Sequence, residues 1–440
     1  MSDRSLLRKD IVGWSLYDFA NTIYSMNIVS LYLKRYLVED LGQDDRYFDI
    51  PFSISMLLAA LLLPALGAMS DHSTRKRIFL LLFTLTCCIS VGLMAYVPPG
   101  AIVLMIILFI ISNFCYEAGQ PFYNALLYSV ADGRQARFVS GIGVSLGYVG
   151  AILGMILILP FVTGSVYSWD VPFLDAGGKN ASFLPTAILF MLFALPLFLW
   201  VKESPPVAAR RIGWKASYKD VWDGIRQTRK YPGVLRFLIA DYFFEDAVAT
   251  AIINFGLYCS LVMNLAEERI TSFLIVSTVA AVLGSVVIGK LAQYWSLKKL
   301  LRVIVIGWVV TLTLFVFIDS MAAVWVLGSA VGVFLGGLWT TSRPMLAELV
   351  PRGELGRFFG LFALSGRAAA IVGPLVWTTV VYLFHPRRPI GQTAVELLGI
   401  SDVDSGKLAY RVGILSLAIM MLIGLYIFRK VPDLGNERHG

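Results

Sequence analysis

Charged residues are scarce in this chain of 440 residues. Asp, Glu, Lys and Arg make up 15% of it and hydrophobic residues 58%, whereas soluble globular proteins carry about 25% charged residues. The longest polar connection runs only from 202 to 232. The composition therefore excludes a separate soluble domain and predicts an integral membrane protein. At ~20 residues for each span, the length allows about a dozen helices.

Cysteine and histidine are equally rare. The three histidines fall in loops or in the C-terminal tail, and the sequence has no phosphate-binding loop. The sequence gives no support to an enzyme, and neither a metal nor another cofactor is expected. All four cysteines lie inside apolar runs, without the spacing of metal ligands or of a disulfide framework: Cys87, Cys88, Cys115 and Cys259.

The basic residues indicate orientation. The first apolar run has no small-residue cleavage site after a short core, so it is expected to stay as an anchor. If both termini lie on one side, that side holds 25 of the 37 lysines and arginines, while acidic residues dominate the opposite connections. The positive-inside rule then places the termini and the central loop in the cytoplasm. This distribution also explains the net charge of +8 without a nucleic-acid partner.

Hydropathy divides the chain into twelve expected spans. Within the central loop, Tyr218, Val221, Trp222 and Ile225 recur at helical spacing beside basic residues, which predicts an amphipathic helix at the membrane surface. The spans are expected near 11–37, 52–70, 78–96, 101–130, 138–162, 183–201, 234–262, 271–294, 300–318, 322–346, 357–384 and 410–428.

An internal repeat relates the two halves. The segment 130–138 aligns with 350–358 at an offset of 220 residues, and Asp18-Phe19 aligns with Asp241-Tyr242 at 223. Two six-helix halves of like orientation are typical of secondary transporters. We therefore predict an all-α integral membrane fold. Its expected parts are an N-terminal half (1–201), a cytoplasmic loop (202–232) and a C-terminal half (233–440).

Polar side chains follow one face of spans 1 and 4. On span 4 the spacing is i, i+4, i+7 and i+11, and span 1 repeats it from Trp14 through Asp18 and Asn21 to Ser25, with Tyr24 beside them. Ionisable groups inside a span are rare and usually functional, so these faces are candidates for a substrate cavity. The span 4 residues are Asn113, Glu117, Gln120 and Asn124.

Spans 7 and 10 carry the remaining candidates. Span 7 offers Asp241, Glu245 and Asp246, and span 10 offers Arg343, a buried guanidinium that would need a carboxylate partner. A structural interpretation stays open for each acidic group. Asp18 could be hydrated or cap a neighbouring helix near the cytoplasmic end, Glu117 could be a protonated acid in a helix interface, and the span 7 acids could be counter-ions of Arg343 or Arg367.

Two motifs carry a resemblance. The run Gly67-Ala68-Met69-Ser70-Asp71-His72-Ser73-Thr74-Arg75-Lys76-Arg77 resembles the loop between helices 2 and 3 of the major facilitator superfamily. Within that superfamily, Gly13-Trp14 with Tyr17-Asp18-Phe19-Ala20-Asn21 looks like the opening of the autophagy-linked vacuolar amino-acid exporter family and its bacterial relatives of unknown substrate. The resemblance implies that helices 1, 4, 7 and 10 line a central cavity, and these are the four spans named above.

The same resemblance implies a gate at the loop between spans 2 and 3. Asp71 would meet the N-terminus of span 11 near Arg357, and Arg75 and Arg137 would belong to the same gate. The basic trio 75–77 would also fix topology and contact lipid headgroups. The second half departs from the pattern, because Gln293 stands where an acidic residue would be expected.

These observations favour a secondary transporter for a small polar or zwitterionic solute, similar to an amino acid, that works by alternating access. Proton coupling is a hypothesis motivated by Asp18, Glu117, Glu245 and Asp246, since a desolvated acid binds a proton readily. The alternatives are a lipid flippase, which would need a half-apolar cavity with a lateral opening, and a solute sensor without net flux. The expected partners are the solute, membrane lipids and protons, and we expect a monomer in a bacterial inner membrane.

Overall fold

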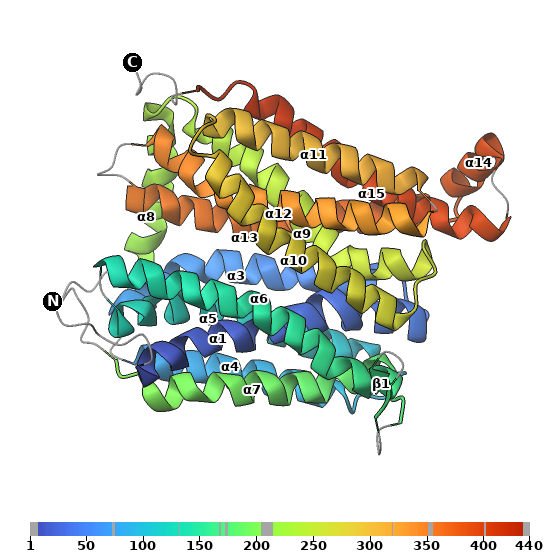
Figure 1. Cartoon of the computed structure of the whole chain (residues 1–440), viewed down its shortest axis with the longest axis horizontal. Helices are drawn as coiled ribbons and strands as arrows, with labels where there is room; N and C mark the ends of the chain where they lie inside the picture. Colours follow the sequence, from blue (N-terminus) through green and yellow to red (C-terminus); the bar gives the residue numbers. More distant parts are fainter. Residues whose placement is uncertain are drawn as a thin grey trace. The chain divides into compact units, whose positions relative to one another are not determined.

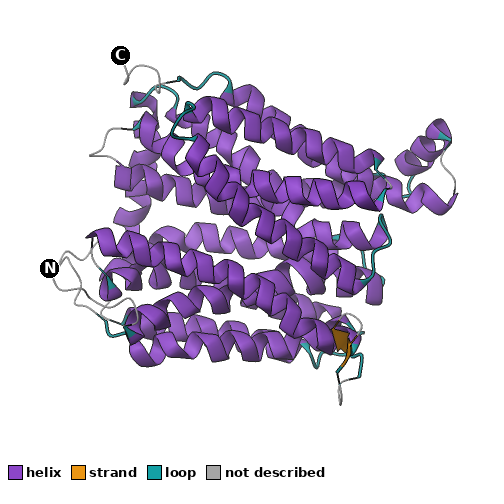
Figure 2. Ribbon diagram, in the orientation of Figure 1, coloured by secondary structure: helices purple, strands orange, loops and turns teal. Residues whose placement is uncertain are grey.

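The computed structural model describes residues 8–72, 75–131, 133–166, 169–171, 175–203, 214–318, 320–350, 355–399 and 402–433. These residues are almost entirely helical, and the one sheet among them is the two-residue pairing of β1 (Ser165–Val166) with β2 (Trp169–Asp170) (Figure 2). The chain divides into two compact units. Unit 1 comprises Met1–Gln43 and Ile54–Lys219, and unit 2 comprises Asp44–Ser53 and Asp220–Gly440.

Unit 1 contains the first six long helical segments of the chain (Figure 1). Its first segment passes without interruption through four helical elements, from Lys9 to Asp40. The elements are α1 (Lys9–Tyr24), η1 (Ser25–Tyr32), α2 (Leu33–Arg35), η2 (Tyr36–Asp40), α3 (Arg46–His72, from Ile54 on), α4 (Lys76–Met94), α5 (Ile102–Val130), α6 (Gly133–Thr163), η3 (Lys179–Ser182) and α7 (Phe183–Trp200).

Unit 2 contains the second set of long helices and a short helix, α14, near one end (Figure 1). The amphipathic helix predicted in the central loop is present as α8 (Trp214–Gln227), which crosses from unit 1 into unit 2. The other elements are η4 (Thr228–Lys230), α9 (Val234–Leu261), α10 (Glu267–Leu291), α11 (Leu297–Phe317), α12 (Met321–Leu349), α13 (Leu355–Leu383), α14 (Pro389–Leu398) and α15 (Asp402–Phe428).

The helices pack in the same pairs within each unit. In unit 1, α1 packs on α6 and α7, and α4 packs on α5 and α7. The corresponding pairs in unit 2 are α9 with α13 and α15, and α11 with α12 and α15. A glycine allows the close approach of the first and fifth helices: a Cβ on Gly150 would lie 2.3 Å from the carbonyl oxygen of Phe19, and one on Gly373 would lie 2.8 Å from that of Asp246. Gly150 and Gly373 are 223 residues apart, the offset of the predicted repeat.

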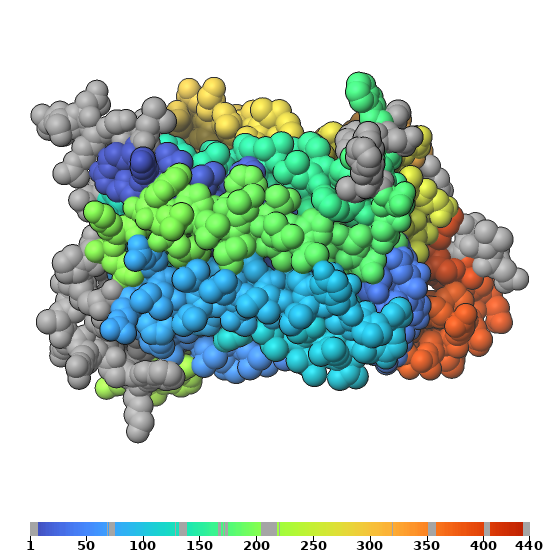
Figure 3. Space-filling model, turned by 90° about the horizontal axis from the view of Figure 1, so that it is seen from below, coloured from blue at the N-terminus to red at the C-terminus, as the bar shows by residue number. Residues whose placement is uncertain are grey.

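Large apolar side chains cover the outer faces of the helices. On α4, exposed residues recur at helical spacing from Ile78 to Leu93, and on α7 from Ile188 to Leu199; the two helices form much of the face in Figure 3. Such surfaces suit a bilayer, where the helices satisfy their own backbone groups. By length and hydropathy, ten helices among the described residues could span a membrane. The other two expected spans correspond to the first segment, divided by its π-helical parts, and to the charge-bearing α9.

The start of α3 belongs to unit 2, a feature absent from the predicted boundaries 1–201 and 233–440, which remain a proposal. Asp45 is 4% exposed, and its carboxylate accepts hydrogen bonds from Trp377 Nε1 (3.0 Å) and from the Tyr410 hydroxyl (3.2 Å). The guanidinium of Arg46 lies 4.4 Å from the centre of the Tyr382 ring. These contacts attach the segment 44–53 to α13 and α15 of unit 2.

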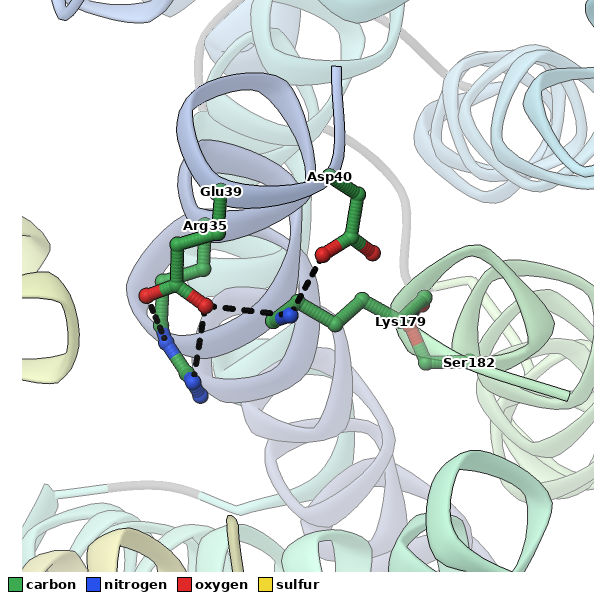
Figure 4. Close-up of polar contacts among 5 residues, drawn as sticks. All are labelled: Arg35, Glu39, Asp40, Lys179 and Ser182. Carbon is green, nitrogen blue, oxygen red and sulfur yellow. Dashed lines mark hydrogen bonds and ion pairs between the residues drawn. The ribbon is translucent and has the colours of Figure 1, made fainter. Parts of the chain in front are cut away.

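An ion-pair network joins two segments of unit 1 that are distant in the sequence (Figure 4). Arg35 Nε and Nη2 donate to the two carboxylate oxygens of Glu39, at 3.1 Å each. Lys179 Nζ lies 3.0 Å from Glu39 Oε2 and 2.6 Å from Asp40 Oδ1. The side chains of Lys179 and Glu39 are only 13% and 14% exposed, so the network links η2 to η3, directly before α7.

We expect Lys179→Met to lower the free energy of unfolding, because two carboxylates would lose their shared cation. The network is partly buried, so the loss should be roughly 1–3 kcal/mol, between the values for exposed and for fully buried pairs. Thermal unfolding of the purified protein in detergent measures it. Lys299→Met is the matched control, since that side chain is exposed and only the Lys299 backbone N–H donates to Ser296. An equal Tm for both variants would show that the network contributes no stability.

Candidate functional site

The polar face of α1 packs against α5 around Tyr123. Trp14 stacks on the Tyr123 ring with 4.7 Å between centroids, and Trp14 Nε1 donates to the carbonyl oxygen of Tyr123 (3.1 Å). The Tyr123 hydroxyl donates to the Trp14 carbonyl oxygen at 3.2 Å, and the carboxylate of Asp18 follows Trp14 by one turn on α1. Helix α6 covers this carboxylate, because a Cβ on Gly143 would lie 2.7 Å from Asp18 Oδ2. Asp18 is therefore half-buried in a polar and aromatic setting.

One to two turns further along α1, a second acid joins the cluster. The rings of Tyr24 and Tyr116 lie 4.8 Å apart, and the Tyr24 hydroxyl hydrogen-bonds with Ser112 (3.2 Å). Glu117 interacts electrostatically with both tyrosines, and Asp18 interacts with Tyr116. We call Asp18, Tyr24, Tyr116, Glu117 and Tyr123 the acid–tyrosine cluster. Of the predicted site residues, Asp18, Tyr24 and Glu117 are thus brought together in unit 1.

The predicted amides have unequal surroundings. Asn113 is 2% exposed, and its Nδ2 donates to Ser55 Oγ of α3 at 2.7 Å, which gives it a packing contact within unit 1. Asn21 is 6% exposed, Gln120 is half-buried and Asn124 is exposed. The residues of α5 that the spacing placed on one face therefore differ in burial and in their contacts.

The middle of the first span has a local structure that the sequence did not indicate. Residues Ser25–Tyr32 form a π-helix directly after Tyr24, and the Ser30 hydroxyl donates to the carbonyl oxygen of Ser25, five residues back (3.1 Å). Asn27 is fully buried there; its Nδ2 donates to the carbonyl oxygen of Ile23, and its Oδ1 has no hydrogen-bond partner. π-Helical turns are rare and concentrate at functional sites. The unpaired amide oxygen of Asn27, which follows the cluster along the first span, is consistent with a functional role of this π-helix.

In unit 2, the acids of α9 contact α12 and α13. Trp339 Nε1 donates to Glu245 Oε2 at 3.1 Å, and Arg343 interacts electrostatically with the same carboxylate. Asp246 is fully buried and its Oδ1 accepts the backbone N–H of Gly373 at 2.7 Å. Glu245, Asp246 and Arg343 thus lie near one another within unit 2.

The expectation that Arg343 is buried was wrong. Its side chain is exposed, as is that of Trp339, which is 41% exposed one turn before it. A guanidinium loses its hydration at a high free-energy cost. Arg343 lies in the last two turns of α12, beyond the glycines that pack against α10, and its charge stays accessible. An accessible guanidinium can bind a carboxylate from outside the protein.

The predicted gate lies largely outside the described residues. The side chains of Asp71, Arg137 and Arg357 are not described, and Arg75 is exposed. Sequence reasoning missed Glu203, whose carboxylate oxygens accept the backbone N–H groups of Lys76 and Arg77 at 3.0 Å each. Glu203 thus caps the N-terminus of α4, where the helix dipole favours a negative charge. An acidic residue directly after span 6 was the available signal.

A separate groove of about 620 Å³ lies in unit 1. Its lining is mostly apolar and shares no residue with the acid–tyrosine cluster, so it does not suit a polar solute. The lining residues are Ala95, Tyr96, Leu157, Phe161, Gly177, Asn180, Ala181, Leu184, Pro185, Ile188 and Leu189.

Comparison with known proteins agrees with this architecture. The nucleoside transporter NupG matches with a TM-score of 0.72 at 15% sequence identity, over 96% of this chain and 98% of NupG. A bacterial homologue of the human lysosomal transporter Spinster, in an inward-facing and unoccupied conformation, matches with a TM-score of 0.71 at 12% identity, over 96% of both chains. The fold predicted from the sequence is confirmed, because the chain shares the fold of these two transporter structures.

Comparison with related sequences identifies the family of the chain among proteins of this fold. An uncharacterised MFS-type transporter of Bacillus subtilis, YxiO, is 26% identical over 434 residues, which cover 96% of this chain and 94% of YxiO. Autophagy-related protein 22 of Kluyveromyces lactis is 24% identical over 91% of this chain and 94% of its own length. The family model described as "Vacuole effluxer Atg22 like" matches residues 46–136 and 128–389. The chain belongs to this Atg22-like family, as the motif at Gly13-Trp14 suggested.

Proposed function

We propose that the chain moves a small polar or zwitterionic solute, similar to an amino acid, by alternating access. The observation that carries this proposal is the acid–tyrosine cluster of unit 1. Its two carboxylates interact with Tyr116, whose ring also packs beside Tyr24. Carboxylates and aromatic faces are the groups that bind an ammonium ion.

Unit 2 carries a group of the opposite charge, the exposed guanidinium of Arg343. It has the geometry to bind a carboxylate through two parallel hydrogen bonds. A zwitterion carries one group of each kind, and a neutral sugar carries neither. The name "vacuole effluxer" of the family agrees with transport of a metabolite, while the nucleoside specificity in the name of NupG belongs to a chain only 15% identical.

We further propose that the solute moves together with a proton and that the termini are cytoplasmic. The buried acids support coupling, and the excess of lysine and arginine on one side supports the orientation. Relatives include both bacterial proteins and vacuolar effluxers. For this chain, the similarity to YxiO of Bacillus subtilis over 96% of its length favours a bacterial inner membrane.

A thermal-shift screen of the purified protein against amino acids, nucleosides, sugars and peptides tests the substrate class. A ligand present at 100 times its Kd should stabilise the protein by about 2.7 kcal/mol. We expect amino acids to raise Tm and neutral sugars to leave it unchanged. Stabilisation by nucleosides alone would overturn the proposed substrate class.

Flux measurements test the coupling. We expect proteoliposomes to accumulate the best amino acid when a pH gradient is imposed, and to lose this accumulation when an ionophore collapses the gradient. Accumulation that ignores the gradient would contradict proton coupling. Binding without any flux would instead indicate a sensor.

A lipid flippase is the second candidate, and the apolar groove of unit 1 favours it. Acyl chains would suit the side chains around Leu157 and Leu184. Fluorescent phospholipids in proteoliposomes distinguish the two functions, because a flippase would move the label across the bilayer in the absence of any amino acid.

A further inference from the structure

Asp241 on α9 differs from the other acids of the spans. Its side chain is 1% exposed, and neither carboxylate oxygen has a hydrogen-bond partner. Ser342 on α12 lies close enough to interact with it, is also 1% exposed, and its hydroxyl likewise lacks a partner. Three buried oxygens without a partner therefore meet at one place within unit 2.

The neighbouring carboxylates each have a donor. Glu245 accepts the Trp339 indole N–H, and Asp246 accepts the Gly373 backbone N–H. Among the described residues, Asp241 is the one carboxylate with two buried oxygens that both lack a partner. Of the three carboxylates of α9, Asp241 is therefore the one whose surroundings stabilise the ionised form least.

We propose that Asp241 carries the coupling proton, with Ser342 as the acceptor for the O–H group of the protonated acid. This inference rests on the proposed proton-coupled function and assigns the residue that performs the coupling. An ionised carboxylate buried without donors is costly, whereas a neutral acid needs a single acceptor. Three oxygens also fall short of the six or more that hard metal cations such as calcium require, which favours a proton over a metal ion.

The charged groups around Asp241 agree with this assignment. Glu245, one turn along α9, interacts with it as a like charge, and Arg343 of α12 interacts with Glu245. Where α15 passes Ala240 it presents Gly424, which carries no charge.

The chemical step is a simple proton transfer. Binding of the proton forms one O–H bond on Asp241 and removes one negative charge from the buried site. Release breaks that bond and delivers the proton to water when the site becomes hydrated. Because release leaves an unpaired buried charge, it requires access of water, and access of water is what a change of conformation supplies.

Infrared difference spectroscopy of the full chain in lipid tests the assignment without any substrate. We expect the carbonyl stretch of a protonated carboxyl group at neutral pH in the wild type. It should be lost in Asp241→Asn and kept in Glu245→Gln, the matched control on the same helix. Ser342→Ala should change the frequency of the band, because the acceptor of its O–H group is gone. His385 lies outside the spans, and burial together with Arg387 lowers its pKa, but an imidazole has no carbonyl band.

Two infrared results would overturn the proposal: no such band in the wild type, or a band that persists in Asp241→Asn. Flux of a labelled amino-acid mixture provides the second readout. Asp241→Asn should lose accumulation driven by a pH gradient but keep exchange of the mixture across the membrane, and gradient-driven accumulation at the wild-type level would contradict its role. If the wild type neither accumulates nor exchanges amino acids, the proposed function fails, while the infrared result still decides whether Asp241 holds a proton.

Discussion

Gly336→Ala is expected to destabilise the protein by about 1–3 kcal/mol or more, the range measured when a packed interior is overfilled. A Cβ at this position would lie 2.0 Å from the carbonyl oxygen of Ala281 and 2.5 Å from Ser285 Oγ, both on α10. The first contact is with backbone, so a rotation of a side chain cannot relieve it. Helices α10 and α12 would have to separate, and Tm should fall by roughly 2–4 °C for each kcal/mol.

The close approach extends along both helices. Gly332 and Gly328 lie one and two turns before Gly336 on α12, and a Cβ on each would meet Ser277 O at 2.1 Å and the Phe273 ring at 2.1 Å. Small residues at this spacing allow helices to pack tightly in a bilayer, where dispersion between helices drives association.

Gly406→Ala is the matched control, since this glycine lies in α15 with no atom within 4 Å of an added Cβ. Alanine is the better helix former by about 1 kcal/mol, so the control should be neutral or slightly stabilising. Thermal unfolding in detergent compares the two variants. An equal Tm would mean that α10 and α12 can separate without cost, contrary to the observed packing.

The course of the helices could be predicted from sequence because hydropathy and turn residues act locally. The span expected at 234–262 is α9 (Val234–Leu261), and the one expected at 101–130 is α5 (Ile102–Val130). The attachment of 44–53 to unit 2 could not be predicted, because it depends on Trp377 and Tyr410, more than 300 residues away in the chain. The acidic residues of that connection gave no indication of their donors.

Part of the candidate site could also be predicted, because the spacing of residues along a helix is a local property of the sequence. Helical spacing placed Asp18, Glu117 and Tyr24 on faces that the structure brings together, because spacing along a helix determines which side chains share a face. It could not show that Asn113 donates to Ser55, since the partner helix is not encoded in the spacing. Nor could it show that both carboxylate oxygens of Asp241 lack a hydrogen-bond partner.

Glu117→Gln should weaken binding of an amino acid by about tenfold or more. Glutamine keeps the size of the side chain and removes its charge, and a hydrogen bond to a charged group contributes about 1.5–3 kcal/mol, where about 1.4 kcal/mol corresponds to a factor of ten. The substituted position interacts with Tyr24 and Tyr116, so the aromatic part of the cluster should remain. Isothermal titration with the amino acid that gives the largest thermal shift measures the change in Kd.

The same substitution separates the two interpretations of Glu117. If Glu117 were a protonated acid confined to a helix interface, glutamine would replace one neutral hydrogen-bonding group by another, and Kd would stay unchanged. If Glu117 binds the ammonium group, Kd rises while Tm without ligand stays near the wild-type value. Glu396→Gln on α14 removes the same charge from an exposed position outside the spans and should leave both quantities unchanged. A loss of affinity specific to Glu117→Gln therefore requires a direct electrostatic interaction between this carboxylate and the solute.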